Sequence, residues 1–193
     1  MKSDVMIDLE TLDTTPTATV LTIGAVKFDP FGDTISKDPA DNLYIKVDID
    51  SCDKLGLTTS QSTIDWWSQQ DPKAQDEAFS TEGRIPIHEA MNQLYKFCWG
   101  AQRVWSHGSA FDIIICEHIF AKLSKAVPWN FWQVRCTRTL FDIGINPERV
   151  SVTAHHALSD AIDQASGVQT VMRTLRTSTK LNGQLIQPYA NMR

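Results

Sequence analysis

The chain opens with three apolar stretches separated by turn-rich ones. Residues 4–9, 20–28 and 43–49 are rich in β-branched and other apolar residues, and Gly, Pro and Asp gather between them. Strands joined in succession by short connections commonly pair with their neighbours in antiparallel order. This part of the pattern predicts an antiparallel meander of three strands.

Beyond residue 60 the apolar residues change to helical spacing. They recur every three to four positions over residues 64–70, 73–79, 86–99, 111–123 and 157–175, with short β-like runs at 103–106 and 131–134. Strands first, then helices alternating with strands, predict an α/β domain whose mixed sheet adds parallel strands to the meander and is flanked by helices.

Length and composition indicate how the chain is divided. A chain of 193 residues with 42% hydrophobic and 21% charged residues can bury one substantial core. We expect a single domain over residues 1–176. Residues 177–193 are rich in Ser, Thr, Asn and Gln, which is typical of a loosely held C-terminal extension.

The formal net charge of −5 argues against nucleic-acid binding through a generally basic surface. A local group of basic residues at the edge of a site is compatible with this net charge. Carboxylates of a metal site would account for part of the acidic excess. Four cysteines stand far apart without zinc-ligand spacing, so we expect buried free thiols: Cys52, Cys98, Cys116 and Cys136. No signal-like start and no apolar run near the ~20 residues of a membrane span are present, which predicts a cytoplasmic protein.

The first of three chemically informative segments contains Asp8 and Glu10. Residues two apart on a strand face the same side, so the two carboxylates would lie together while Ile7 and Leu9 face the core. Apposed carboxylates repel each other unless one is protonated or a divalent cation lies between them. Taken alone, the pair is more simply a solvated strand end.

The second segment, residues 105–112, reads as a strand, a small-residue turn and the start of a helix. Asp112 would lie in the first helical turn, where Asp commonly stabilises the helix dipole. The place just after the carboxyl end of a sheet strand is also where α/β proteins form their sites. Both interpretations stay open for this residue alone.

The third segment, residues 155–161, opens the longest amphipathic helix. Asp160 lies on a nearly apolar helix face beside Ala157 and Ala161, which is an unusual place for a carboxylate. His155 precedes the helix and could reach over a site into which Asp160 points. For either His155 or His156 considered alone, the simpler interpretation is a histidine on the surface or one that is hydrogen-bonded within the core.

Taken together, the three segments resemble the motifs of the DEDDh exonuclease superfamily, which includes polymerase proofreading subunits and ribonuclease T. The order and spacing agree, and the resemblance extends over nearly the whole chain. Within the superfamily, the sequence most resembles the branch that contains phage exonuclease A and the bacterial 3′-5′ exoribonuclease-like proteins. The matches are D-x-E-T at Asp8, Glu10 and Thr11, F-D at Phe111 and Asp112, and H-x-A-x-x-D-A at His155, Ala157, Asp160 and Ala161.

This resemblance implies a ribonuclease-H-like fold and a 3′-to-5′ exonuclease that uses two Mg²⁺ or Mn²⁺ ions. It would release nucleoside 5′-monophosphates from single-stranded DNA or RNA, and many relatives act as homodimers. By the resemblance, the metal ligands are Asp8, Glu10, Asp112 and Asp160, and the general base is His155, a residue type that titrates near neutral pH.

Substrate contacts are expected from side chains around these motifs, chiefly aromatic ones that can stack on bases. The candidates are Thr11, Leu12, Trp66, Trp67, Trp105, His107 and Phe111. At least one of the Trp66–Trp67 pair should pack into the core instead. Three arginines could touch phosphates, although a solvated surface role is at least as simple for each: Arg135, Arg138 and Arg149.

Three alternatives use the same residues differently. A ribonuclease-H-like endonuclease or a short-oligonucleotide hydrolase would also need clustered carboxylates and metals. A non-catalytic nucleic-acid-binding domain would not need them, and every acidic position is present. His155 favours the exonuclease. The choice between DNA and RNA stays open, because one contact to the 2′-hydroxyl can decide it.

Overall fold

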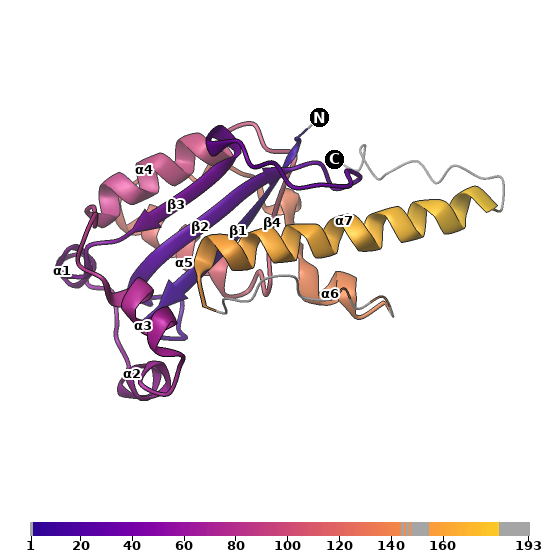
Figure 1. Ribbon diagram of the computed structural model, residues 1–193. Helices are drawn as coiled ribbons and strands as arrows, with labels where there is room; N and C mark the ends of the chain where they lie inside the picture. The colour runs from indigo at the N-terminus through magenta and orange to yellow at the C-terminus, as the bar shows by residue number, and fades with distance from the viewer. Residues whose placement is uncertain (1, 144, 146, 148–154, 182–193) are drawn as a thin grey trace.

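Five strands form one mixed sheet in the order β3-β2-β1-β4-β5 (Figure 1). The computed structural model describes residues 2–143, 145, 147 and 155–181, with side chains as far as Arg176. The β1–β2 and β2–β3 pairs are antiparallel, whereas β1–β4 and β4–β5 are parallel. This confirms the predicted mixed α/β sheet. Its strands are β1 (Asp4–Thr11), β2 (Val20–Phe28), β3 (Asn42–Lys46), β4 (Arg103–Ser106) and β5 (Val134–Cys136).

Helices connect and cover these strands. Within the described residues they are α1 (Ile49–Lys54), α2 (Gln61–Trp67), α3 (Pro72–Phe79), α4 (Ile87–Cys98), α5 (Asp112–Lys122), α6 (Thr137–Phe141) and α7 (Ala157–Leu181), with 3₁₀ turns η1 (Pro39–Asp41) and η2 (Phe131–Gln133). Helix α7 continues to Leu181, beyond the predicted end at 175. Helices α1 and α6 were not predicted, because fewer than two turns leave no measurable period.

The strand predicted at residues 131–134 is wrong in position. Residues 131–133 form the 3₁₀ turn η2, and the strand begins at Val134. The side chain of Gln133 explains the difference, since its Oε1 accepts a hydrogen bond from the Asn130 N–H at 2.7 Å. This capping box stabilises the turn over residues 131–133, so β5 begins three residues later than predicted.

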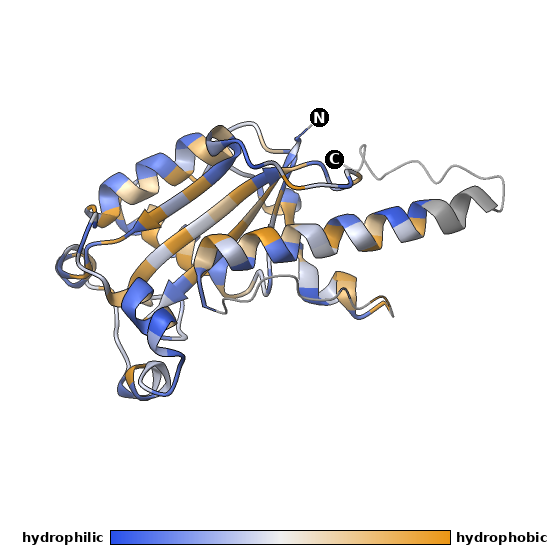
Figure 2. Cartoon of the chain, viewed as in Figure 1, coloured by the Kyte–Doolittle hydropathy of each residue, from blue (hydrophilic) through white to orange (hydrophobic). Residues whose placement is uncertain are grey.

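The two faces of the sheet carry different helices. Val5, Ile7 and Leu9 of β1 belong to the core cluster that also contains residues of α4 and α5, whereas Met6 packs with residues of α7. Figure 2 shows the central strands as largely apolar and α4 as polar on one side and apolar on the other. Alternation along β1 therefore directs even-numbered residues, including Asp8, toward α7.

Close packing brings the start of α7 down onto the sheet. A Cβ atom at Gly24 of β2 would lie 2.1 Å from the carbonyl carbon of Ala157, so only glycine fits there. Ala157, Ala161 and Ala165 are fully buried along the same helix face. Small residues on both sides thus set the short distance between α7 and β2, and with it the position of the residues at the helix start.

All four cysteines are free thiols, as predicted; Cys52, Cys98 and Cys116 are buried, and Cys136 is half-buried. Within the described part of the chain, no helix has the length and apolar character needed to cross a membrane.

Candidate active site

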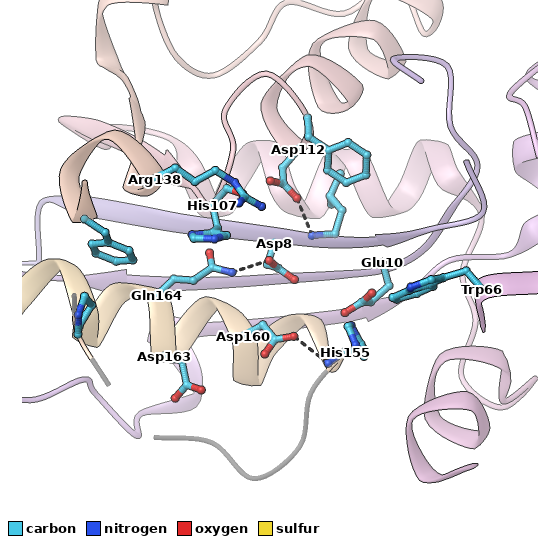
Figure 3. A pocket seen from close by; sticks show the side chains of 14 residues that line it. Asp8, Glu10, Trp66, His107, Asp112, Arg138, His155, Asp160, Asp163 and Gln164 are labelled. Atoms are coloured by element: carbon cyan, nitrogen blue, oxygen red, sulfur yellow. Dashed lines mark hydrogen bonds between the residues drawn. The ribbon is translucent and has the colours of Figure 1, made fainter. Parts of the chain in front are cut away.

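A pocket of about 570 Å³ lies over the carboxyl-terminal part of β1, between the starts of α5 and α7 (Figure 3). Residues far apart in the sequence meet there because β4, parallel to β1, ends beside the middle of that strand, and α5 begins a few residues after β4. All five residues of the predicted catalytic set line this pocket: Asp8, Glu10, Asp112, His155 and Asp160.

Asp8 and Glu10 project from the same side of β1 toward α7 (Figure 3). Glu10 is 8% exposed, and Asp8 is half-buried in the pocket. The pKa of Asp8 is raised well above its usual range, first by burial and then by the negative charges of Asp112 and Glu10. The pocket therefore concentrates negative charge where burial makes that charge costly.

Asp112 enters from the first turn of α5. Pairing between β1 and β4 stops at Met6 and Trp105, so no β4 residue takes the N–H of Leu9. The Asp112 Oδ1 accepts this N–H at 3.1 Å, which fixes the carboxylate against the strand (Figure 3). Burial raises the pKa of Asp112 to about 7, against the opposing effect of hydrogen bonds such as this one.

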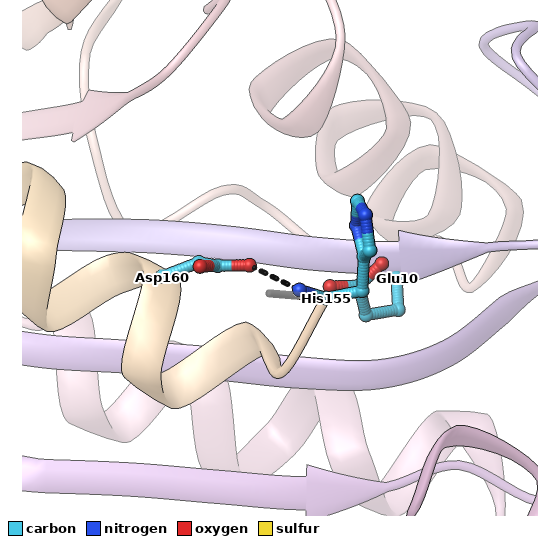
Figure 4. Close-up of side chains that lie close together, drawn as sticks. All are labelled: Glu10, His155 and Asp160. Carbon is cyan, nitrogen blue, oxygen red and sulfur yellow. Dashed lines mark hydrogen bonds between the residues drawn. The ribbon is translucent and has the colours of Figure 1, made fainter. Parts of the chain in front are cut away.

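Glu10, His155 and Asp160 form a close group in the pocket (Figure 4). One potential ligand atom of each lies within 4.8 Å of the others, a spacing that could hold a metal ion. The backbone N–H of His155 donates to the Asp160 Oδ2 at 2.9 Å. This bond stabilises His155 in a left-handed backbone conformation, φ 63°, which is uncommon for a side chain other than glycine.

The two adjacent histidines turn to different places. The His155 ring lines the pocket and meets the Trp66 ring edge-on, with centroids 4.9 Å apart. The His156 ring instead stacks on Tyr44 of β3 at 4.5 Å, and its Nδ1 accepts the Ser159 N–H at 3.3 Å. His156 thus caps the start of α7, and of these two histidines it is His155 that faces the pocket.

A second pocket continues from the first on the α2 side. Trp66, Phe111, Leu9 and Glu10 line both, and Thr11 lines the second. Trp66 is 42% exposed and can offer a ring face to a base, whereas Trp67 is 2% exposed and donates its Nε1–H to the Thr11 carbonyl at 2.9 Å. The expectation that one tryptophan of the pair packs into the core is confirmed.

Of the other residues predicted to contact substrate, some line the pocket and one is buried in the core. His107 and Arg138 line the main pocket. The side chain of Leu12 lies in a core cluster with Leu21 and Trp67 and lines neither pocket.

Two further candidates are corrected by the structure. Trp105 is 3% exposed and donates its Nε1–H to Asp4 at 2.8 Å, so it cannot stack on a base. Arg135 donates to the carbonyl groups of Trp132 and Val134 rather than lining the pocket. Trp105 is held by a residue distant in the sequence, and Arg135 is held by backbone carbonyl groups one and three positions before it. Arg149 lies outside the described residues.

The pocket also contains residues that the sequence analysis missed: Phe141, Pro147, Asp163 and Gln164. Gln164 follows Asp160 by four positions, so the two share a face of α7. Helical spacing from Asp160 could have found Gln164.

The comparison with protein families agrees with this geometry. The family model described as the 3′-5′ exoribonuclease Rv2179c-like domain matches residues 3–172. The chain belongs to this family. It is therefore a 3′-5′ exonuclease, which confirms the predicted enzyme class. A relative of the exonuclease, the exodeoxyribonuclease of Enterobacteria phage T4, is 28% identical over 163 residues, covering 70% of this chain and 69% of the phage protein.

Solved structures share the exonuclease's fold. The RNase domain of yeast Pop2 matches with a TM-score of 0.59 at 12% identity, covering 91% of this chain and 78% of that one. Exonuclease X in complex with 5′ overhanging duplex DNA matches with a TM-score of 0.55 at 15% identity, covering 89% and 92%. The nuclease domain of 3′hExo, a DEDDh family member bound to rAMP, matches at 0.52 and 15%, covering 89% and 92%. These likenesses confirm the ribonuclease-H-like fold.

Proposed function

We propose that the exonuclease hydrolyses the terminal phosphodiester bond at the 3′ end of single-stranded DNA or RNA, uses two Mg²⁺ or Mn²⁺ ions, and releases nucleoside 5′-monophosphates. One observation carries the proposal: the four carboxylates and the histidine of the predicted set, brought together from β1, α5 and the start of α7, line a single pocket. The family assignment supports the 3′-to-5′ direction.

The donor set suits divalent cations with a preference for oxygen ligands. Asp8, Glu10, Asp112 and Asp160 would hold them, because carboxylate oxygens are the ligands that Mg²⁺ and Mn²⁺ favour. The raised pKa values of Asp8 and Asp112 reflect buried negative charge that bound cations would offset. When bound, such ions make water more acidic and neutralise charge that develops on the phosphate.

His155 is proposed as the general base. Its ring lies at the pocket wall, close to Glu10 and Asp160, and an imidazole can take a proton from water near neutral pH. The left-handed backbone and the hydrogen bond to Asp160 hold it in place before substrate arrives.

The surrounding side chains would hold the terminal nucleotide. Trp66 offers a partly exposed ring beside His155, and Thr11 and Phe111 continue the wall into the second pocket. Arg138 and His107, on the opposite side in Figure 3, could contact the phosphates.

The test is digestion of 5′-labelled single-stranded DNA and RNA of equal sequence, with Mg²⁺, with Mn²⁺ and with a chelator. Asp8→Ala and His155→Ala would be compared with His156→Phe, which keeps an aromatic ring against Tyr44. We expect a metal-dependent ladder that shortens from the 3′ end. The Asp8 variant should be inactive, and the His155 variant should lose about 10²- to 10⁴-fold in kcat.

The control variant His156→Phe should stay within about tenfold of wild type, because His156 does not line the pocket. The faster substrate identifies the preferred sugar. A circular single strand should resist cleavage, and cutting of the circle would favour an endonuclease. Equal losses in both histidine variants would contradict the assignment of His155 as base.

A further inference from the structure

Gln164 is joined directly to the most central carboxylate of the pocket. Its Nε2 donates a hydrogen bond to the Asp8 Oδ1 at 2.7 Å (Figure 3). The two residues are 156 positions apart in sequence, so the bond links β1 to α7 inside the site. Because Gln164 and Asp160 share one face of α7, the helix presents a carboxylate and an amide to β1 together.

The other end of the Gln164 amide has no partner in the described part of the chain. Its Oε1 is buried, yet nothing donates a hydrogen bond to it. A buried amide oxygen that accepts no hydrogen bond costs free energy, and buried polar atoms without a partner are rare in native proteins. The missing donor would be supplied by a group that enters the pocket.

The chemical type of residue 164 also fits a metal site. A Lys or Arg donor here would repel cations, and a further carboxylate would add to the charge that already surrounds Asp8. An uncharged amide on a two-methylene side chain reaches Asp8 and holds it without either effect.

We infer that Gln164 is a positioning residue for the metal site: Nε2 fixes the orientation of Asp8, and Oε1 accepts a hydrogen bond from a water molecule that a bound cation brings. This rests on the proposed metal-dependent function. Groups that orient ligating side chains commonly change metal affinity by 10- to 100-fold when removed, although they do not touch the ion.

The test uses Gln164→Met in the full chain, since methionine keeps the length of the side chain and removes both polar atoms. Titration of metal-free protein with Mn²⁺, followed by calorimetry and by the electron paramagnetic resonance of bound Mn²⁺, should give a dissociation constant about 10- to 100-fold higher than wild type. The half-saturating Mn²⁺ concentration for exonuclease activity should rise in parallel, with KM for the oligonucleotide unchanged at saturating Mn²⁺.

Thr170→Val is the matched control. Thr170 lies on the same helix, donates to the Ser166 carbonyl at 3.1 Å and does not line the pocket, so its replacement tests general damage to α7. This variant should bind Mn²⁺ like wild type.

Equal Mn²⁺ affinity in Gln164→Met and wild type would overturn the inference. Failure of wild type itself to bind Mn²⁺ would instead overturn the proposed metal-dependent function. Should the variant not fold, the side-chain amide signals of Gln164 in wild type provide the answer by NMR. They should shift on titration with Mg²⁺ at the midpoint of metal binding, and unmoved signals would refute the role.

Discussion

Asp112 combines burial with a carboxyl group whose pKa is raised from its ordinary 3.8 to about 7. In metal-free protein the folded state therefore binds a proton that the unfolded state has lost between about pH 4 and pH 7. The free energy of unfolding must therefore fall as the pH rises through this window. Above it, Asp112 is ionised in both states, and the stabilisation that protonation gave to the folded state is lost. With each pKa unit worth about 1.4 kcal/mol, the cost at pH 8 is on the order of 4 kcal/mol.

Asp112→Asn should remove this cost. The amide keeps an oxygen that can accept the Leu9 N–H, and it carries no charge. We expect the variant, in chelator, to melt several degrees above wild type at pH 8 and close to wild type at pH 4.5, as measured by scanning calorimetry. Its exonuclease activity should be lost. The same dependence of melting temperature on pH in both proteins would show that Asp112 does not carry the effect.

Gly24 shows how two elements are fitted to each other. A methyl group there would overlap the backbone of α7 at Ala157, so the start of the helix would have to move away from β2. His155 and Asp160 would move with it, away from Asp8. The packing of one strand against one helix thus controls the distance between the proposed metal ligands on different elements.

Gly24→Ala should therefore lose stability and activity together. We expect a loss of about 3 kcal/mol in urea unfolding, at the upper end of the range for overpacked cores, and a large fall in kcat. Gly83→Ala is the control: its φ is 71°, but no atom lies within 4 Å of the added methyl group. It should cost only about 1 to 2 kcal/mol of backbone strain and leave kcat unchanged. Equal behaviour of the two variants would argue against the close approach at Gly24.

The charge of the whole molecule restricts how it binds nucleic acid. The net charge is −5, and among the described residues that line the main pocket Arg138 is the one Lys or Arg. Few phosphates can be neutralised in this way. Binding should depend mainly on the proposed metal site and on stacking, with a weak dependence on salt.

The dependence of kcat/KM on KCl, at constant Mg²⁺, measures this directly. We expect log(kcat/KM) to fall with log[KCl] at a slope of about −1 to −2, and Arg138→Ala to be shallower by about 0.7, the value for one phosphate of a single strand. A slope steeper than about −4 would require a larger basic surface, such as one that a second subunit would bring. Light scattering on the same sample tests the predicted homodimer, which a monomer mass at micromolar concentration would contradict.

Much of the fold follows from local patterns in the sequence. The order of strands and helices, the alternation along β1 and the long helix from Ala157 were predictable, because a period of two or 3.6 residues is expressed wherever the segment lies. The same alternation predicted that Asp8 and Glu10 share one side of their strand. These features need only the chain's own backbone geometry.

Contacts between distant segments were not predictable in this way. Periodicity indicates which side of an element a residue occupies, but it does not indicate which residue of another element it will meet. The bond from Gln164 to Asp8, the turn of His155 rather than His156 into the pocket, and the burial of Leu12 and Trp105 all depend on how α7, β1 and their neighbours cross. Those crossings result from close packing at points such as Gly24, and packing exists only once the whole chain has folded.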